Sequence, residues 1–186
     1  MNGQSHLKNT SSTQPISGLL TDLLILGLLG AGAAALRIYL RIPLNIPGHH
    51  GLEVMALLLI GRQYSGLSIA GSVTSASAAL VFLMPFAGIK DPFLPVIFLL
   101  IGAFIDLTYR YIGTARSKAM FLIAMGGIAY VLIPLSRILI SLTTSYPYES
   151  LMKGGFVWPV VSHFFFGALG GWFAWFITRT TRNILS

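Results

Sequence analysis

The sequence predicts an all-α integral membrane protein: a bundle of about six transmembrane helices with an irregular Pro/Gly loop after the first helix. Of the 186 residues, 55% are hydrophobic and only 9% are charged, whereas soluble domains carry about 25% charged residues. The mean hydropathy is +0.79. The apolar residues also occur in continuous runs rather than in the alternating pattern of a membrane strand.

Six apolar runs supply the predicted helices. They cover residues 17–40, 51–61, 65–85, 93–111, 119–142 and 158–178. A hydrocarbon core of about 30 Å needs about 20 helical residues, but about 11 residues rise only about 16 Å. The run 51–61 therefore spans only if it begins near Pro47 or is tilted and buried. If it is re-entrant, every later helix reverses its orientation.

The chain divides into a polar N-terminal tail, residues 1–16, and a single transmembrane helical domain, residues 17–186. The tail is rich in Ser, Thr and Asn, which predicts disorder. A cleaved signal peptide is the alternative, because the segment 31–33 (Ala-Gly-Ala) resembles a cleavage site. The absence of cysteine excludes disulfides and thiolate metal sites.

Lys and Arg predict the orientation, because cytoplasmic loops collect these residues. With the N-terminus inside and six spans, seven fall on the cytoplasmic side and four on the outer side. The inner set is Lys8, Arg62, Arg110, Arg116, Lys118, Arg179 and Arg182, and the outer set is Arg37, Arg41, Lys90 and Lys153. We therefore expect a multi-pass protein of the cell membrane with both termini cytoplasmic. Topology explains the net charge of +7 better than nucleic-acid binding does.

Small residues recur at every fourth position of the first run, at Gly27, Ala31 and Ala35. The run 65–85 repeats the pattern with Gly, Ala, Ser and Thr. Small residues let helix backbones approach closely in lipid. The ridges therefore predict either packing inside this bundle or a docking face for another membrane subunit.

The segment 41–51 contains two prolines and two glycines, which prevent a regular helix. We expect it to fold over the outer mouth of the bundle. Asn45, His49, His50 and Glu53 lie in or beside it and are candidates for binding an organic ligand. A metal ion is the alternative occupant, although the spacing matches no strong metal motif.

Two polar residues lie within predicted spans, where burial is costly. Arg137 and His163 both fall in the outer half, so we expect them to line an outward cavity that suits a small anionic molecule. Arg137 has no acid at i±3 or i±4, and its partner is a ligand carboxylate, Glu53 or Glu149. Trp158 stacks on a ligand ring in this reading, or belongs to an aromatic belt.

Three other charged residues have simpler explanations. Arg37 either snorkels to the interface or joins the same cavity. Asp106 and Arg110 are four residues apart, which favours a structural pair on one helix face, with a role in proton coupling as the alternative. No catalytic triad, P-loop or dinucleotide motif occurs, so we expect neither an enzyme nor a bound cofactor.

The segment from residue 30 through RIYLRIPLNIPG and LEVMALLLIGRQYSGLSIAGSV resembles the first half of a substrate-binding S component of an energy-coupling factor (ECF) transporter, with the biotin-type outline. The resemblance implies six helices and a ligand bound from outside beneath the loop Leu44–Gly51. It also implies that Ala31 and Ala35 dock onto a membrane coupling subunit driven by two ATPase subunits. Its function is then uptake of a small, anionic, vitamin-like molecule.

Two other function classes stay open at this point. One is a structural or assembly membrane protein of the small cell-shape type. The other is an integral membrane enzyme that uses His49, His50, Glu53 and His163. Co-purified ATPase subunits favour uptake, a cell-wall synthesis partner favours assembly, and stoichiometric metal favours an enzyme.

Overall fold

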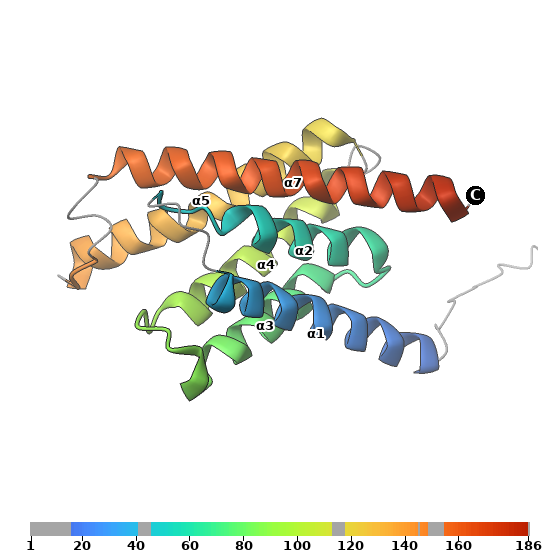
Figure 1. Cartoon of the computed structure of the whole chain (residues 1–186), viewed down its shortest axis with the longest axis horizontal. Helices are drawn as coiled ribbons and strands as arrows, with labels where there is room; N and C mark the ends of the chain where they lie inside the picture. Colours follow the sequence, from blue (N-terminus) through green and yellow to red (C-terminus); the bar gives the residue numbers. More distant parts are fainter. Residues whose placement is uncertain (1–15, 41–45, 113–117, 145, 149–154, 186) are drawn as a thin grey trace, which may run out of the picture.

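The computed structural model describes residues 16–40, 46–112, 118–144, 146–148 and 155–185. Within these residues, six α-helices and one 3-10 turn follow one another along the chain (Figure 1). They are α1 (Ile16–Tyr39), α2 (Gly51–Tyr64), α3 (Ala70–Phe82), η1 (Pro85–Ala87), α4 (Leu94–Ile112), α5 (Ala119–Thr144) and α7 (Val157–Leu185). The predicted tail, residues 1–16, lies outside the described residues except for Ile16.

The six predicted runs coincide with the six α-helices. The largest differences are at α3, which is shorter than the run 65–85, and at α7, which continues beyond residue 178. Four helices of the described chain, α1, α4, α5 and α7, are long and apolar enough to cross a membrane. The fold is therefore compatible with a helical membrane protein. The count of six spans stays a prediction, because α2 and α3 have 14 and 13 residues and rise only about 20 Å each.

The helices alternate in direction, so the bundle has two distinct ends (Figure 1). At the terminal end, α1 begins and α2, α4 and α7 finish. At the loop end, α1, α3 and α5 finish and α2 begins. This order places the described members of the predicted cytoplasmic set, such as Arg62 and Arg179, at the terminal end, and Arg37 and Lys90 at the loop end. Which end faces the cytoplasm stays a prediction.

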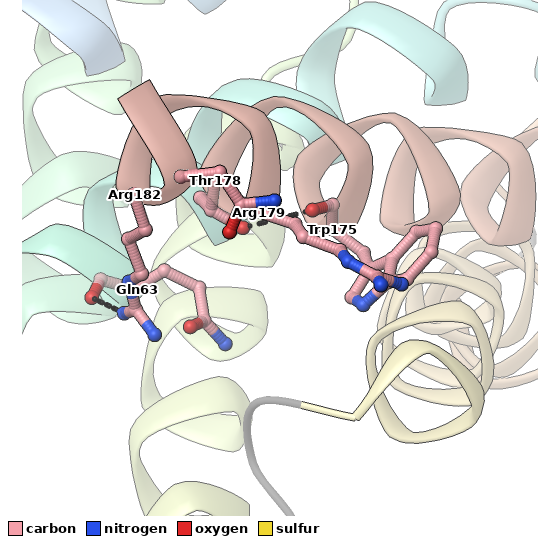
Figure 2. A pocket seen from close by; sticks show the side chains of 6 residues that line it. Gln63, Trp175, Thr178, Arg179 and Arg182 are labelled. Atoms are coloured by element: carbon pink, nitrogen blue, oxygen red, sulfur yellow. Dashed lines mark hydrogen bonds between the residues drawn. The ribbon is translucent and has the colours of Figure 1, made fainter. Parts of the chain in front are cut away.

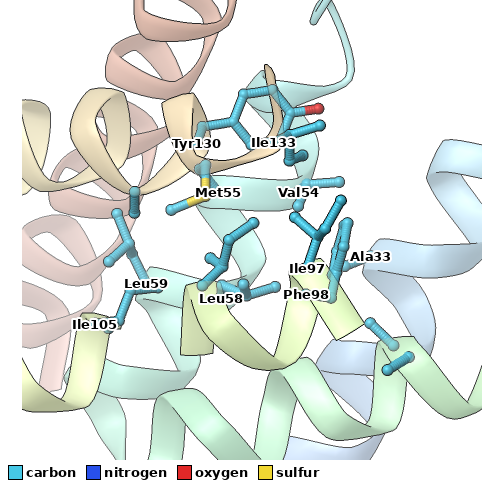
Figure 3. Close-up of a cluster of buried hydrophobic side chains, with 14 of the residues drawn as sticks. Ala33, Val54, Met55, Leu58, Leu59, Ile97, Phe98, Ile105, Tyr130 and Ile133 are labelled. Carbon is cyan, nitrogen blue, oxygen red and sulfur yellow. The ribbon is translucent and has the colours of Figure 1, made fainter. Parts of the chain in front are cut away.

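The short helix α2 lies inside the bundle, and 9 of its residues are buried. Figure 3 shows its apolar side chains, including Met55 and Leu58, packed against Phe98 of α4 and Tyr130 of α5. Side chains of the neighbouring helices therefore cover α2 on most sides and pack closely against it. A 14-residue helix is thus held in place by its neighbours rather than by its own length.

Glycine lets α5 and α7 approach each other at the backbone. A Cβ added at Gly126 would collide with the carbonyl oxygen of Gly167, and one added at Gly171 with that of Leu122. The pair Gly167 and Gly171 is a small-xxx-small motif, which aligns the two helices along much of their length. The positions of the side chains on these two helices, including Tyr130 and His163, depend on this contact.

The small residues of α1 are divided between the interior and the flank of the bundle. Gly30 meets the backbone of Thr74 in α3, and Ser77 Oγ donates a 2.7 Å hydrogen bond to the carbonyl oxygen of Gly27. Ala31 and Ala35 are half-buried. Gly30, one position before Ala31, thus packs inside the bundle, whereas docking through Gly27, Ala31 and Ala35 stays a prediction.

The predicted pair of Asp106 with Arg110 is wrong. Asp106 Oδ1 lies 3.2 Å from Nε of Arg62, a residue of α2, whereas Arg110 is exposed. Its two carboxylate oxygens also accept hydrogen bonds of 2.9 and 2.7 Å from the backbone N–H groups of Gly71 and Ser72. Asp106 thus supplies the acceptors that the first turn of α3 lacks, and the carboxylate ties α2, α3 and α4 together.

Candidate functional site at the loop end

A group of polar side chains gathers where α2 begins, and we call it the loop-end cluster. It comprises Arg37, His49, His50, Glu53, Tyr130 and His163. Its members come from α1, from the segment before α2, and from α2, α5 and α7. The sequence predicted that His49, His50, Glu53 and His163 would form one site, and the helix crossings bring them to the same end of the bundle.

The turn before α2 positions the first members of the cluster. Gly48 has φ +80°, a conformation that glycine adopts without strain. It lies against the His163 ring, since a Cβ at Gly48 would be 2.7 Å from His163 Cγ. His49 Nδ1 lies 2.9 Å from the carbonyl oxygen of Ile46. A carbonyl can only accept, so Nδ1 carries the proton and His49 Nε2 is left as the second polar atom of the ring.

Glu53 supplies the carboxylate of the cluster and is deeply buried. Its side chain is 6% exposed, and Oε1 lies 2.6 Å from His50 Nδ1. The other oxygen, Oε2, is buried and has no hydrogen-bond partner among the described residues. The His50 ring also packs against His49, with centroids 4.0 Å apart. One carboxylate oxygen is therefore satisfied within the chain, and the other remains an unused acceptor.

Tyr130 of α5 and His163 of α7 pack against the turn before α2 and complete the cluster. Their rings stack with centroids 5.1 Å apart, and Arg37 Nη1 donates a 3.3 Å hydrogen bond to the Tyr130 hydroxyl. His163 Nδ1 lies 2.6 Å from the Pro159 carbonyl oxygen, so Nδ1 carries the proton. In the neutral ring Nε2 is then an acceptor. The Arg37 guanidinium has further N–H groups beyond the one given to Tyr130.

Arg137 belongs to a separate ion pair at the same end. Its Nε and Nη2 donate hydrogen bonds of 3.0 and 2.8 Å to Oδ2 of Asp91, in the segment before α4. The expectation that Glu53 or Glu149 would be its protein partner is wrong for Glu53, and Glu149 lies outside the described residues. The Arg137 charge is balanced without a ligand, because helix packing brings Asp91 to it.

Tyr148 closes this ion pair from the connection between α5 and α7. Its hydroxyl donates a 3.3 Å hydrogen bond to Oδ1 of Asp91, and the Arg137 guanidinium lies 5.4 Å from its ring centroid. Burial, followed by the Asp91 carboxylate, raises the pKa of Tyr148 from 10.0 to about 12. The hydroxyl therefore keeps its proton and remains a donor to Asp91 over the physiological pH range.

The remaining predicted site residues are less informative. Trp158 is 51% exposed at the start of α7, as an aromatic belt residue is. Asn45 lies outside the described residues. In the described part of the chain, no group of three or more His, Asp or Glu side chains is placed to hold a metal ion.

Two important residues were not recognised in the sequence. Tyr130 lies seven residues before Arg137, so the two share a helix face, and a buried hydroxyl there needs a partner. That spacing could have placed Tyr130 beside the polar residues. Asp91 follows Lys90 of the predicted outer set, but no local spacing connects it with Arg137, 46 positions away.

Comparison of the chain with models of known protein families, with curated proteins and with solved structures finds no match. The assignment of a function to the loop-end cluster therefore rests on its own geometry and chemistry.

Proposed function

We propose that the chain is a membrane-embedded substrate-binding subunit for the uptake of a small, vitamin-like molecule, energised by a membrane coupling subunit and two ATPase subunits. The observation that carries the proposal is the free acceptor of Glu53. Its Oε2 is buried and has no partner in the part of the chain that the structure describes, and the same cluster also presents His163, His49 and Arg37.

An unused acceptor of this kind favours a ligand that donates a hydrogen bond. Leaving a buried polar group unsatisfied costs about 1–3 kcal/mol, and more for a charged group. A ligand N–H or O–H directed at Glu53 Oε2 removes that cost. The gain is specific, because an analogue without the donor leaves the carboxylate oxygen unpaired.

The other end of the ligand is assigned to Arg37. A guanidinium holds a carboxylate through two parallel hydrogen bonds, and Arg37 makes one described bond, to Tyr130. Arg137 is less suited to this role because Asp91 already neutralises it. The ligand class is therefore a small molecule that carries an anionic or acceptor group and, apart from it, an N–H or O–H donor.

The transport part of the proposal rests on the flank of α1. Gly27 has open space where a Cβ would be, and Ala31 and Ala35 are half-buried. A second membrane helix could approach closely along these three residues. Docking at this flank leaves the loop-end cluster accessible, which an uptake subunit requires. In this proposal both termini are cytoplasmic and the loop end faces outward.

Native mass spectrometry of gently purified protein tests the binding part. We expect a retained small molecule in the wild-type protein, and its loss in Glu53→Gln, which replaces an acceptor oxygen with an amide. Asp22→Asn is the matched control, because Asp22 bonds Ser65 at the terminal end. Equal retention in Glu53→Gln and wild-type protein would show that Glu53 does not contact the ligand.

Co-purification tests the partners. We expect Ala31→Trp to abolish transport and the recovery of ATPase subunits while leaving the retained ligand in place, since the indole blocks the docking flank only. Loss of both ligand and partners would indicate that Ala31 supports the bundle. A cell-wall synthesis protein recovered in place of ATPases would favour the assembly function instead.

A further inference from the structure

A second polar site lies at the terminal end, far along the bundle from the loop-end cluster. A cavity of about 300 Å³ opens between the end of α2 and the last turns of α7. Its walls are formed by Gln63, Trp175, Thr178, Arg179, Arg182 and Asn183. The α7 residues follow i, i+3, i+4, i+7 and i+8, so they form one face of the helix.

Two guanidinium groups make this cavity cationic. Figure 2 shows the Arg182 side chain reaching toward Gln63 and the Arg179 side chain reaching toward Trp175. Arg182 Nη2 donates a 3.3 Å hydrogen bond to the Gln63 carbonyl oxygen, and Arg179 lies 5.1 Å from the Trp175 ring centroid. Each guanidinium keeps N–H groups for another acceptor.

The nearby acids do not neutralise these two charges. Within the described ranges, neither Arg179 nor Arg182 lies within ion-pair distance of a carboxylate. Asp106 is engaged with Arg62 and the first turn of α3, and Asp22 accepts from Ser65. Among the described residues no carboxylate balances the positive charge of the cavity, which therefore suits an anion.

The length of α7 indicates the level of the membrane at which the cavity lies. The helix has 29 residues and is about 43 Å long, which exceeds a hydrocarbon core of about 30 Å. Counting about 20 residues from Val157 brings the chain to Phe176. Residues 178–183 then lie at the level of the lipid head groups, where phosphate groups are concentrated.

The helix face that leads from the cavity into the membrane is apolar. Trp172 and Phe176 lie three residues before Trp175 and Arg179, on the same face. They are 41% and 50% exposed and stack with centroids 5.9 Å apart. This surface is suited to contact an acyl chain whose head group occupies the cavity.

We infer that the cavity between α2 and α7 binds the phosphate group of an anionic phospholipid. Arg179 and Arg182 hold the phosphate oxygens, and the exposed aromatic face of α7 contacts the acyl chain. The inference is independent of the uptake function, because it uses none of the loop-end residues. A free phosphate shares the head-group chemistry but cannot use the aromatic face, and this difference decides between the two sources.

The test measures lipid retention. Full-length protein is purified in mild detergent, mixed with equal amounts of phosphatidylglycerol and phosphatidylcholine, and analysed by native mass spectrometry. We expect preferential binding of phosphatidylglycerol, reduced about tenfold or more in Arg179→Gln/Arg182→Gln, since charge-assisted bonds are lost. Arg110→Gln is the matched control, because Arg110 is exposed at the same end but does not line the cavity.

Two further arms make the result decisive. The variant Arg179→Lys/Arg182→Lys keeps the charge and should retain intermediate binding, which guards against a folding defect in the Gln variant. Inorganic phosphate at millimolar concentration should not displace the bound lipid. Equal retention of both lipids, an equal loss in Arg110→Gln, or displacement by inorganic phosphate would each overturn the lipid site.

Discussion

The ion pair of Arg137 with Asp91 gives a quantitative test of how the loop end is held together. Two N–H groups of Arg137 bond one carboxylate oxygen at 3.0 and 2.8 Å. The side chains are only 17% and 13% exposed. Exposed ion pairs contribute about 0–1 kcal/mol, whereas hydrogen bonds to charged groups contribute about 1.5–3 kcal/mol. Because this pair is mostly buried, we expect a coupling energy of about 1.5–3 kcal/mol.

A double-mutant cycle measures that coupling. Asp91→Ala and Arg137→Ala should each lower the free energy of unfolding, since each leaves the other charge without its partner. The double variant should cost clearly less than the sum of the two single variants. Equilibrium unfolding from mild detergent into SDS, followed by tryptophan fluorescence, provides the four free energies.

The control and the ligand readout separate the roles of Arg137. Lys90 is exposed beside Asp91, so Lys90→Ala with Arg137→Ala should show a coupling near zero. If Arg137 only pairs with Asp91, then Asp91→Ala and Arg137→Ala should weaken ligand binding to a similar extent, because each removes the same ion pair from the loop end. If Arg137 holds a ligand carboxylate, Arg137→Ala alone weakens binding. A coupling below about 0.5 kcal/mol would refute the structural role.

Three other perturbations have defined outcomes. Asp106→Ala should cost about 3–5 kcal/mol in the same unfolding assay, because it leaves the buried charge of Arg62 uncompensated; a loss under 1 kcal/mol would contradict this reading. Gly30→Ala should lower the thermal midpoint because its Cβ meets the α3 backbone, whereas Gly27→Ala should not, since open space lies at that position; equal midpoints would contradict the packing. The raised pKa of Tyr148 means that the folded protein holds this proton more tightly than the unfolded chain. Its contribution is therefore complete below pH 10 and lost as pH rises from 10 to about 12; the stability difference between wild type and Tyr148→Phe should shrink over that window, and a constant difference would argue against the bond to Asp91.

The helices could be predicted from the sequence because the hydrophobicity of each apolar run is visible in its own residues. Continuous hydrophobicity over the run 119–142 is a local property, and it produced α5 (Ala119–Thr144). The gathering of His49, His50 and Glu53 was also predictable, because they are neighbours in the chain. Glycine and proline before Gly51 predicted the irregular turn for the same reason.

The polar partners could not be predicted in this way. Spacing rules connect residues three or four apart on one helix, and so they favoured Arg110 as the partner of Asp106. In the fold, Asp106 pairs with Arg62 instead. The helix α2 packs inside the bundle, and the buried guanidinium of Arg62 needs a carboxylate. A desolvated charge takes the partner that the fold brings to it, whatever the separation along the chain.

The sequence by itself thus predicted an all-helical membrane chain of about six spans with a polar turn ahead of α2, and the described part of the structure has four helices apolar and long enough for a membrane. Only the tertiary structure decided that Arg137 pairs with Asp91, that Glu53 keeps a buried oxygen with no partner among the described residues, and that α7 and α2 enclose a cationic cavity. The physical reason is that hydrophobicity acts residue by residue along the chain. Hydrogen bonds and ion pairs depend on which atoms the close-packed helices place within about 3 Å of each other.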